Sequence, residues 1–118
     1  MKRMISHVLN ATKYSYNGLI RLLKEDAFRY EIFAAVISIS LFIIIKVSFE
    51  DMATLIFLIL LVLAFESLNT AIEEIIDFIS PEYSETAKHA KDMGSFAVLC
   101  MLLASLYFVI KTVIFNYQ

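Results

Sequence analysis

The sequence predicts an all-α integral membrane protein: a bundle of three transmembrane helices preceded by an N-terminal amphipathic helix at the membrane interface. Sixty per cent of the 118 residues are hydrophobic, more apolar surface than a soluble domain of this length could bury. Long apolar runs occur in three places, and the chain contains only two glycines and one proline to interrupt them. Because no repeat or linker divides the sequence, we expect residues 1–118 to form one membrane-embedded domain.

Residues 1–30 form the predicted amphipathic region. Its apolar side chains recur at helical spacing, at Met4, Ile5, Val8, Leu9, Tyr16, Leu19, Ile20 and Leu23. The opposite face is polar and basic, a pattern typical of a helix that lies in the membrane interface. An ordinary helix packed on its own domain is the alternative. Gly18 is expected to divide the region into two pieces.

Three membrane helices are predicted at about residues 32–49, 52–79 and 94–115. Lys46 interrupts the first, where its long side chain can reach the far membrane surface. The second is apolar to Phe65 and should continue as one helix to Ile79, because nothing between them breaks it. Ser80 and Pro81 predict a stop and restart, with Ser80 as N-cap and Pro81 at the first helical position. A short helix should then run into the third span.

The distribution of basic residues predicts the orientation in the membrane. Six of the ten lysines and arginines lie in the first thirty positions, and Lys88 and Lys91 lie in the later polar segment. The connection near Lys46 is net acidic. By the positive-inside rule, the N-terminus and residues 80–93 should be cytoplasmic. Three crossings then place the C-terminus outside.

Five polar side chains follow the apolar part of the second span, on one face of the predicted helix: Glu66, Asn69, Thr70, Glu73 and Asp77. Carboxylates cost roughly 2.5–3.5 kcal/mol each at the centre of a membrane helix, so their retention indicates a use. Glu66 is the deepest and is a candidate proton acceptor. Glu73, nearer the cytoplasm, is a candidate ligand for a divalent cation. For Asn69 and Thr70, a hydrogen-bonding seam between helices is an equal alternative.

Two further clusters are candidates for binding. Lys88, Lys91, Asp92 and Ser95 share one face of the helix entering the third span, beside Gly94, which permits close approach of a backbone or a ligand. For Lys88, an anchor for lipid headgroups is the simpler interpretation. The charged segment 25–31 lies at the depth where Glu73 should emerge, so a metal site shared between this segment and Glu73 is geometrically possible. The alternative is that its charges simply mark the membrane interface. These patterns alone specify neither a substrate nor a reaction.

The run ESLNTAIE at residues 66–73, followed by Asp77 and by AKDMGS at residues 90–95, resembles the bacterial diacylglycerol kinase family of small integral-membrane lipid kinases. The segments EDAFRYE (25–31) and YSYNG (14–18) match it as well, so the resemblance covers nearly the whole chain. The resemblance implies a homotrimer in the bacterial inner membrane. It also implies transfer of the γ-phosphate of MgATP to diacylglycerol at the cytoplasmic surface, which gives phosphatidic acid.

The resemblance also implies roles for individual positions. Glu66 would be the catalytic base, and Glu25 and Glu73 would hold Mg²⁺. The implied ATP contacts are His7, Tyr14, Glu25, Glu73, Glu82, Tyr83, Ser84, Lys91 and Asp92. The implied lipid-substrate contacts are Ala11, Ser15, Tyr16, Ala27, Phe28, Arg29, Tyr30, Glu31, Glu66, Asn69 and Ser95. Such a set suits phosphoryl transfer, which needs a cation on the phosphates, a lysine and an acceptor for the hydroxyl proton.

Some positions depart from the family pattern. His7 stands where many relatives carry Arg, Ser84 stands where some carry His, and one residue is missing between Gly18 and Glu25. Related undecaprenol kinases share E-x-x-N-T-A-I-E but tend to have small residues after K-D, so Met93 favours diacylglycerol. A non-enzymatic alternative is a small ion-conducting or assembly subunit that uses the carboxylates as a pathway.

Overall fold

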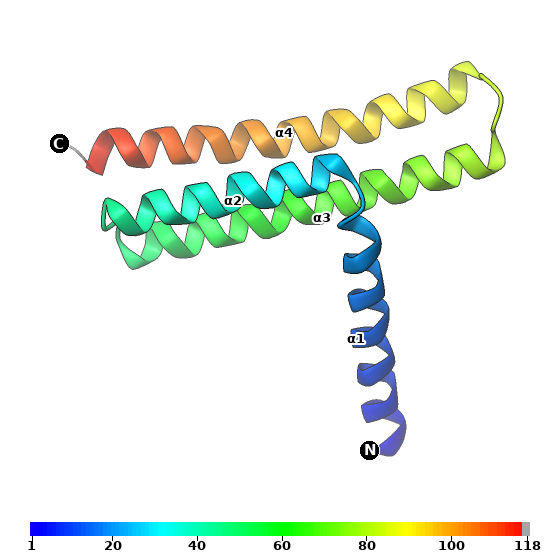
Figure 1. Ribbon diagram of the computed structural model, residues 1–118, viewed down its shortest axis with the longest axis horizontal. Helices are drawn as coiled ribbons and strands as arrows, with labels where there is room; N and C mark the ends of the chain where they lie inside the picture. Colours follow the sequence, from blue (N-terminus) through cyan, green and yellow to red (C-terminus); the bar gives the residue numbers. More distant parts are fainter. Residues whose placement is uncertain (117–118) are drawn as a thin grey trace.

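A computed structural model describes residues 1–116, and all regular structure in that range is helical. The four helices are α1 (Lys2–Leu22), α2 (Asp26–Ile44), α3 (Phe49–Ile79) and α4 (Glu85–Asn116). Helices α2, α3 and α4 lie side by side, whereas α1 leaves the bundle crosswise (Figure 1). The last three helices are each long and apolar enough to cross a membrane. The predicted all-helical fold with three spans and a separate N-terminal helix is therefore confirmed.

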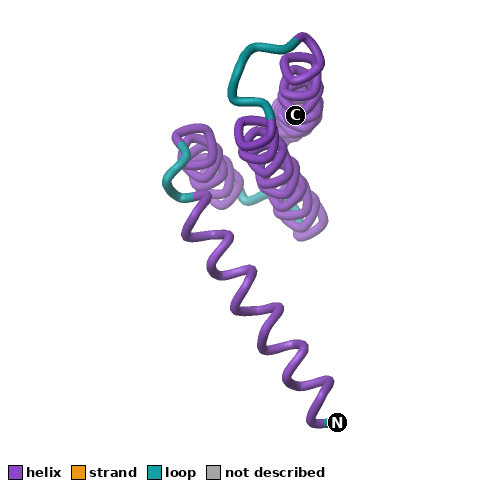
Figure 2. Tube along the Cα trace, turned by 90° about the vertical axis from the view of Figure 1, so that its right-hand side faces the viewer, coloured by secondary structure: helices purple, strands orange, loops and turns teal. Residues whose placement is uncertain are grey.

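Helix α1 is continuous, so the expected division at Gly18 is wrong. Gly18 keeps a negative φ, and a glycine inside a helix costs only about 1 kcal/mol relative to alanine without breaking it. No residue of α1 is buried, and apolar side chains such as Ile5 and Leu9 are uncovered within the chain. Figure 2 shows α1 extending away from the other three helices. It is therefore not packed as an ordinary domain helix within this chain.

Helix α2 ends at Ile44, five residues before the predicted end of the first span at residue 49. The chain turns here because Lys46 adopts a φ of 55°, an uncommon value for a residue other than glycine. Ser48 then caps the next helix, since its Oγ accepts a hydrogen bond from the Asp51 N–H at 3.1 Å. Helix α3 consequently begins at Phe49, three residues before the predicted start.

Helix α3 continues unbroken to Ile79, as predicted. Its 31 residues give a length of about 46 Å, well beyond a hydrocarbon core of about 30 Å. Helix α4 is of similar length, with 32 residues. The joined ends of α3 and α4 overhang the start of α2 (Figure 1). This overhang carries the charged residues that follow Glu66.

The predicted restart at Ser80 and Pro81 is wrong. Ser80 is instead the last cap of α3, where its N–H donates to the Ile76 carbonyl at 2.8 Å. Helix α4 begins only at Glu85, because the Ser84 hydroxyl accepts the Ala87 N–H at 3.0 Å. Pro81 lies in the connection that lets α4 return antiparallel to α3.

The core is small and lies between the three bundle helices. Its buried apolar side chains are Phe28, Phe42, Leu55, Val62, Ala87 and Val98. At the far end of the bundle, Asn116 Nδ2 donates to the Ile45 carbonyl at 2.7 Å and ties the end of α4 to the end of α2. Most large apolar side chains are exposed, so in a membrane they face lipid or another protein chain.

Candidate functional site

The five predicted polar residues of α3, Glu66, Asn69, Thr70, Glu73 and Asp77, form a polar stripe that is buried at one end and exposed at the other. Glu66, Asn69 and Thr70 retain only 5%, 7% and 7% of their exposure, Glu73 is half-buried and Asp77 is exposed. A carboxyl group as deeply enclosed as Glu66 must be paired, protonated or close to a cation. The stripe therefore leads from a buried carboxyl to an exposed one over three helical turns.

Asn69 on α3 lies directly against Gly94 on α4. Its Nδ2 donates to Glu73 Oε1 at 3.3 Å. A Cβ added at Gly94 of α4 would lie closer than 3.0 Å to Asn69 Oδ1 and 3.4 Å from its Cγ. With the Asn69 side chain in this position only glycine fits, which agrees with the close approach predicted at Gly94.

Carboxylates from α2, from α3 and from the turn that precedes α2 lie near Glu66. Glu25 and Glu73 are near enough for their charge to act on Glu66, which in turn acts on Glu31. No basic side chain of residues 1–116 forms an ion pair with Glu31, Glu66 or Glu73. Two buried atoms of this region, Glu31 Oε2 and Asn69 Oδ1, also have no hydrogen-bond partner in the described range. Such a cluster calls for a cation or a proton.

The residues fit a magnesium ion of the kind that binds with a phosphorylated substrate. Mg²⁺ typically takes one or two carboxylates and completes its octahedron with water and phosphate oxygens. Glu25 and Glu73, whose charges both act on Glu66, could supply those carboxylates. Within residues 1–116, no three His, Cys, Asp or Glu side chains form a cage made of protein alone. The donor set thus suits a cation shared with a ligand.

A cleft of about 310 Å³ lies at the turn between α3 and α4. It brings together five of the predicted ATP contacts: Glu82, Tyr83, Ser84, Lys91 and Asp92. Asp77 also lines it and accepts a hydrogen bond from Lys91 Nζ at 2.8 Å. Lys88 also lines the cleft and pairs with Asp92 at 3.1 Å.

An apolar groove of about 420 Å³ lies between α2, α3 and α4. Glu31 and Tyr30 line it from α2, with Leu63 and Val62 from α3 and Leu102 among the residues from α4. Since Glu31 also lies within the range of the Glu66 charge, the groove leads to the acidic cluster. An apolar channel that ends at carboxyl groups can hold a molecule with a long hydrocarbon part and a polar end.

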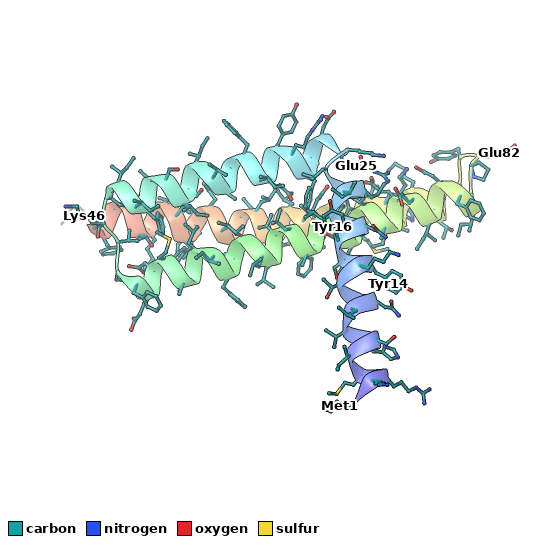
Figure 3. All side chains as sticks on the ribbon, turned by 60° about the horizontal axis from the view of Figure 1, so that its bottom comes forward. Met1, Tyr14, Tyr16, Glu25, Lys46 and Glu82 are labelled. Atoms are coloured by element: carbon teal, nitrogen blue, oxygen red, sulfur yellow. The ribbon has the colours of Figure 1, made fainter. Side chains whose placement is uncertain are left out.

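The predicted contacts on α1 lie apart from the cleft. His7, Ala11 and Tyr14 share a shallow surface pocket of α1, and Ser15 and Tyr16 are exposed. Figure 3 shows Tyr14 on α1, well separated from Glu82 at the turn between α3 and α4. One chain alone therefore does not bring His7 and Tyr14 to the other predicted ATP contacts.

The remaining predicted contacts lie on α2 and α4. Ala27, Arg29 and Tyr30 are exposed, as is Ser95, whereas Phe28 is buried in the core at 2% exposure. Arg29 forms an ion pair with Asp26 one turn away. Phe28 thus differs from its neighbours in serving the packing of α2 against the bundle.

Sequence reasoning missed one ion-pair network next to the cluster. Arg21 at the end of α1 binds both Glu25 and, on α3, Glu74. The hydrogen bond to Glu25 and the charge of Glu74 raise the pKa of the Arg21 guanidinium. The spacing of Arg21 and Glu25, four residues apart, was a usable signal for half of this network. The contact with Glu74 depends on how α1 meets the bundle.

The sequence is similar to those of known diacylglycerol kinases. The family described as prokaryotic diacylglycerol kinase matches residues 13–115. A diacylglycerol kinase from a Sinorhizobium species is 46% identical over 95% of this chain and 82% of its own length. The diacylglycerol kinase of Haemophilus influenzae is 40% identical over 83% and 86%, respectively. That of Escherichia coli K12 is 36% identical over 85% and 83%.

Proposed function

The chain belongs to the family of prokaryotic diacylglycerol kinases, and we propose that it transfers the γ-phosphate of ATP to the free hydroxyl of diacylglycerol, with ADP and phosphatidic acid as products. The observation that carries this proposal is the buried Glu66, which has carboxylates at Glu25 and Glu73 beside it and an apolar groove leading toward it. This combination suits a reaction between a charged nucleotide and a membrane lipid.

We assign Glu66 as the base for the lipid hydroxyl. The hydroxyl oxygen forms a bond to the γ-phosphorus, the bond to the β,γ-bridging oxygen breaks, and its electron pair leaves with ADP. The hydroxyl proton passes to a Glu66 oxygen. Burial at 5% exposure excludes water that would otherwise compete for the phosphoryl group. General-base catalysis of this kind is worth about 10²–10⁴-fold in rate.

The nucleotide would occupy the cleft at the turn between α3 and α4. Lys91 lines that cleft and is oriented by its 2.8 Å contact with Asp77. A lysine there can offset charge on the transferred phosphoryl group. We propose Glu25 and Glu73 as the Mg²⁺ ligands; when bound, the ion neutralises phosphate charge and aligns the γ-phosphate. The Asn69 amide keeps Glu73 in place through their hydrogen bond.

The lipid would enter from the bilayer along the apolar groove. Its acyl part would lie against the apolar lining from α2, α3 and α4, and its hydroxyl would lie at the Glu31 and Glu66 end. Ser38 and Ser105 add the few polar groups of the groove, and both hydroxyls bond backbone carbonyls of their own helices. The groove therefore offers a hydrocarbon surface and leaves recognition to its acidic end.

We further propose that the chain is a homotrimer of the bacterial inner membrane, with its N-terminus and this site cytoplasmic. The basic residues of segments 1–30 and 80–93 support that orientation. The separation of His7 and Tyr14 from the cleft supports a site completed by α1 of a second copy. The extensive exposed apolar surface of the bundle supports assembly within the membrane.

The experiment is a lipid kinase assay with two lipids side by side. Purified protein in mixed micelles receives Mg²⁺, γ-labelled ATP and either diacylglycerol or undecaprenol. We expect labelled phosphatidic acid to form faster than labelled polyprenyl phosphate. A clear preference for undecaprenol would replace the substrate in this proposal. Ion flux in liposomes without ATP consumption on either lipid would instead identify a conducting subunit.

A further inference from the structure

Arg21 joins three separate segments of the chain. It lies in the last turn of α1, where its Nη1 donates to Glu25 Oε1 at 2.5 Å. Its Nη2 pairs with Glu74 Oε1 on α3. Because a guanidinium is planar and presents its donors as a rigid fork, two carboxylates bound to it are fixed relative to each other. Arg21 thus links the end of α1, the N-cap of α2 and the cytoplasmic half of α3 proposed above.

Glu25 is held by Arg21 and not by the helix it precedes. It occupies the N-cap position of α2, yet its side chain makes no capping hydrogen bond. Its backbone is fixed on both sides, since its N–H donates to the Leu22 carbonyl at 2.9 Å and its carbonyl accepts from Arg29 at 3.2 Å. Hydrogen bonds within residues 1–116 engage only Oε1 of the carboxylate, which leaves Oε2 for another partner.

Glu74 on α3 also binds Arg21 and restricts the position of its guanidinium, which in turn contacts Glu25. The Arg21 and Glu25 side chains retain 43% and 38% of their exposure, and an isolated pair of this kind is weak and mobile. Glu74 comes from a different helix and therefore fixes the guanidinium against α3. Its neighbour Glu73 is the second proposed metal ligand. The same turn of α3 thus carries Glu73, a proposed metal ligand, and Glu74, which holds Arg21 beside Glu25, the other proposed ligand.

We propose that Arg21, braced by Glu74, is a positioning residue that holds Glu25 in place for Mg²⁺ opposite Glu73. The inference rests on the proposed function, because it assigns a role relative to that metal site. The opposite role is competition, in which Arg21 occupies Glu25 and its removal frees the carboxylate for the ion. The two roles predict opposite changes in metal affinity.

The test measures metal binding directly. Full-length protein in detergent micelles is titrated with Mn²⁺, and free Mn²⁺ is followed by electron paramagnetic resonance with and without a non-hydrolysable ATP analogue. Loss of a partner that orients a metal ligand typically weakens affinity about 10–100-fold. For Arg21→Gln and Glu74→Gln we expect the lower end, about tenfold. Arg21→Lys should recover part of the affinity, because an ammonium makes one point contact in place of a fork.

Two variants serve as matched controls. Lys24→Gln removes a positive charge from the same turn, and Lys24 forms no ion pair within residues 1–116. Glu50→Gln removes a carboxylate from the first turn of α3, at the other end of the helix from Glu74. Both should keep the wild-type Mn²⁺ affinity and wild-type turnover. Should Arg21→Gln fail to fold, Glu74→Gln decides, because it alters only an exposed carboxylate.

Kinetics separate this inference from the proposed function. In the lipid kinase assay, the KM for Mg²⁺ should rise about tenfold in Arg21→Gln, while kcat at saturating Mg²⁺ changes by about threefold or less. Unchanged or tighter Mn²⁺ binding in both Arg21→Gln and Glu74→Gln would overturn the positioning role, even if the wild type is an active kinase. A wild type that phosphorylates neither lipid, with the expected Mn²⁺ changes, would refute the kinase and retain the positioning role.

Discussion

Replacing Gly94 with alanine should lower the catalytic rate and leave the protein folded. The added Cβ would lie closer than 3.0 Å to Asn69 Oδ1, a distance that real Cβ atoms do not show. The backbones of α3 and α4 are long, packed helices, whereas the Asn69 amide is the end of a side chain. The amide should therefore move, by something on the order of 1 Å. That movement breaks its 3.3 Å hydrogen bond to Glu73.

The expected magnitudes differ for stability and rate. Overfilling a packed site costs about 1–3 kcal/mol, and the better helix propensity of alanine returns about 0.5–1 kcal/mol. The net loss of stability should therefore be about 0–2.5 kcal/mol. A displacement of about 1 Å near the reacting atoms can cost about 10²-fold in rate. We expect a folded protein whose kcat for diacylglycerol falls about 100-fold.

Gly18→Ala is the matched control, because a Cβ there meets nothing within 4 Å. It should leave turnover unchanged and slightly stabilise α1. The assay combines lipid kinase rates with thermal unfolding in the same detergent. The double variant of Gly94→Ala with Asn69→Ala should be no slower than Asn69→Ala alone, since the clash has lost its partner. Wild-type turnover in Gly94→Ala would refute the role given to Asn69.

Three other changes test the cleft and the metal. Asp77→Asn removes the partner of Lys91, so the KM for ATP should rise about tenfold with kcat less affected; equal losses in both would show that Asp77 acts on chemistry itself. Ser84→Ala removes the cap of α4 and should lower stability by about 1 kcal/mol in thermal unfolding, and no loss would mean that another group caps the helix. Chelation of Mg²⁺ should abolish turnover while circular dichroism stays constant, because the described helices are held by packing and hydrogen bonds; helix loss on chelation would contradict this.

The elements that sequence predicted best are those set by local composition. The continuation of α3 to Ile79 follows from the absence of any breaker after Phe65. The ends of helices were harder, because several residues at each turn carry capping signals. Ser80 followed by Pro81 and Ser84 followed by Glu85 are both plausible starts, and the antiparallel return of α4 selects the second. Likewise, α2 ends next to Lys46, which has a positive φ. A glycine would have signalled this turn in the sequence, but a lysine does not.

In the site, too, the features within one helix were predictable from sequence, whereas the contacts between helices were not. The face shared by Glu66, Asn69 and Glu73 follows from helical periodicity, and their burial agrees with it. The pairs of Lys91 with Asp77 and of Arg21 with Glu74 join different helices. Such pairs depend on the relative rotation and height of two helices, which no pattern within one helix encodes. The separation of Tyr14 from the cleft depends on the turn between α1 and α2 in the same manner.

In the proposed mechanism, the buried Glu66 carboxylate accepts the lipid hydroxyl proton in a reaction with ATP. Its most direct test is the single-turnover rate of phosphatidic acid formation by Glu66→Gln, an isosteric change that removes only the proton acceptor. We predict a fall of about 10²–10⁴-fold in that rate, with binding of Mn²⁺ and the ATP analogue unchanged. A Glu66→Gln variant that phosphorylates diacylglycerol at the wild-type single-turnover rate would exclude Glu66 as the base.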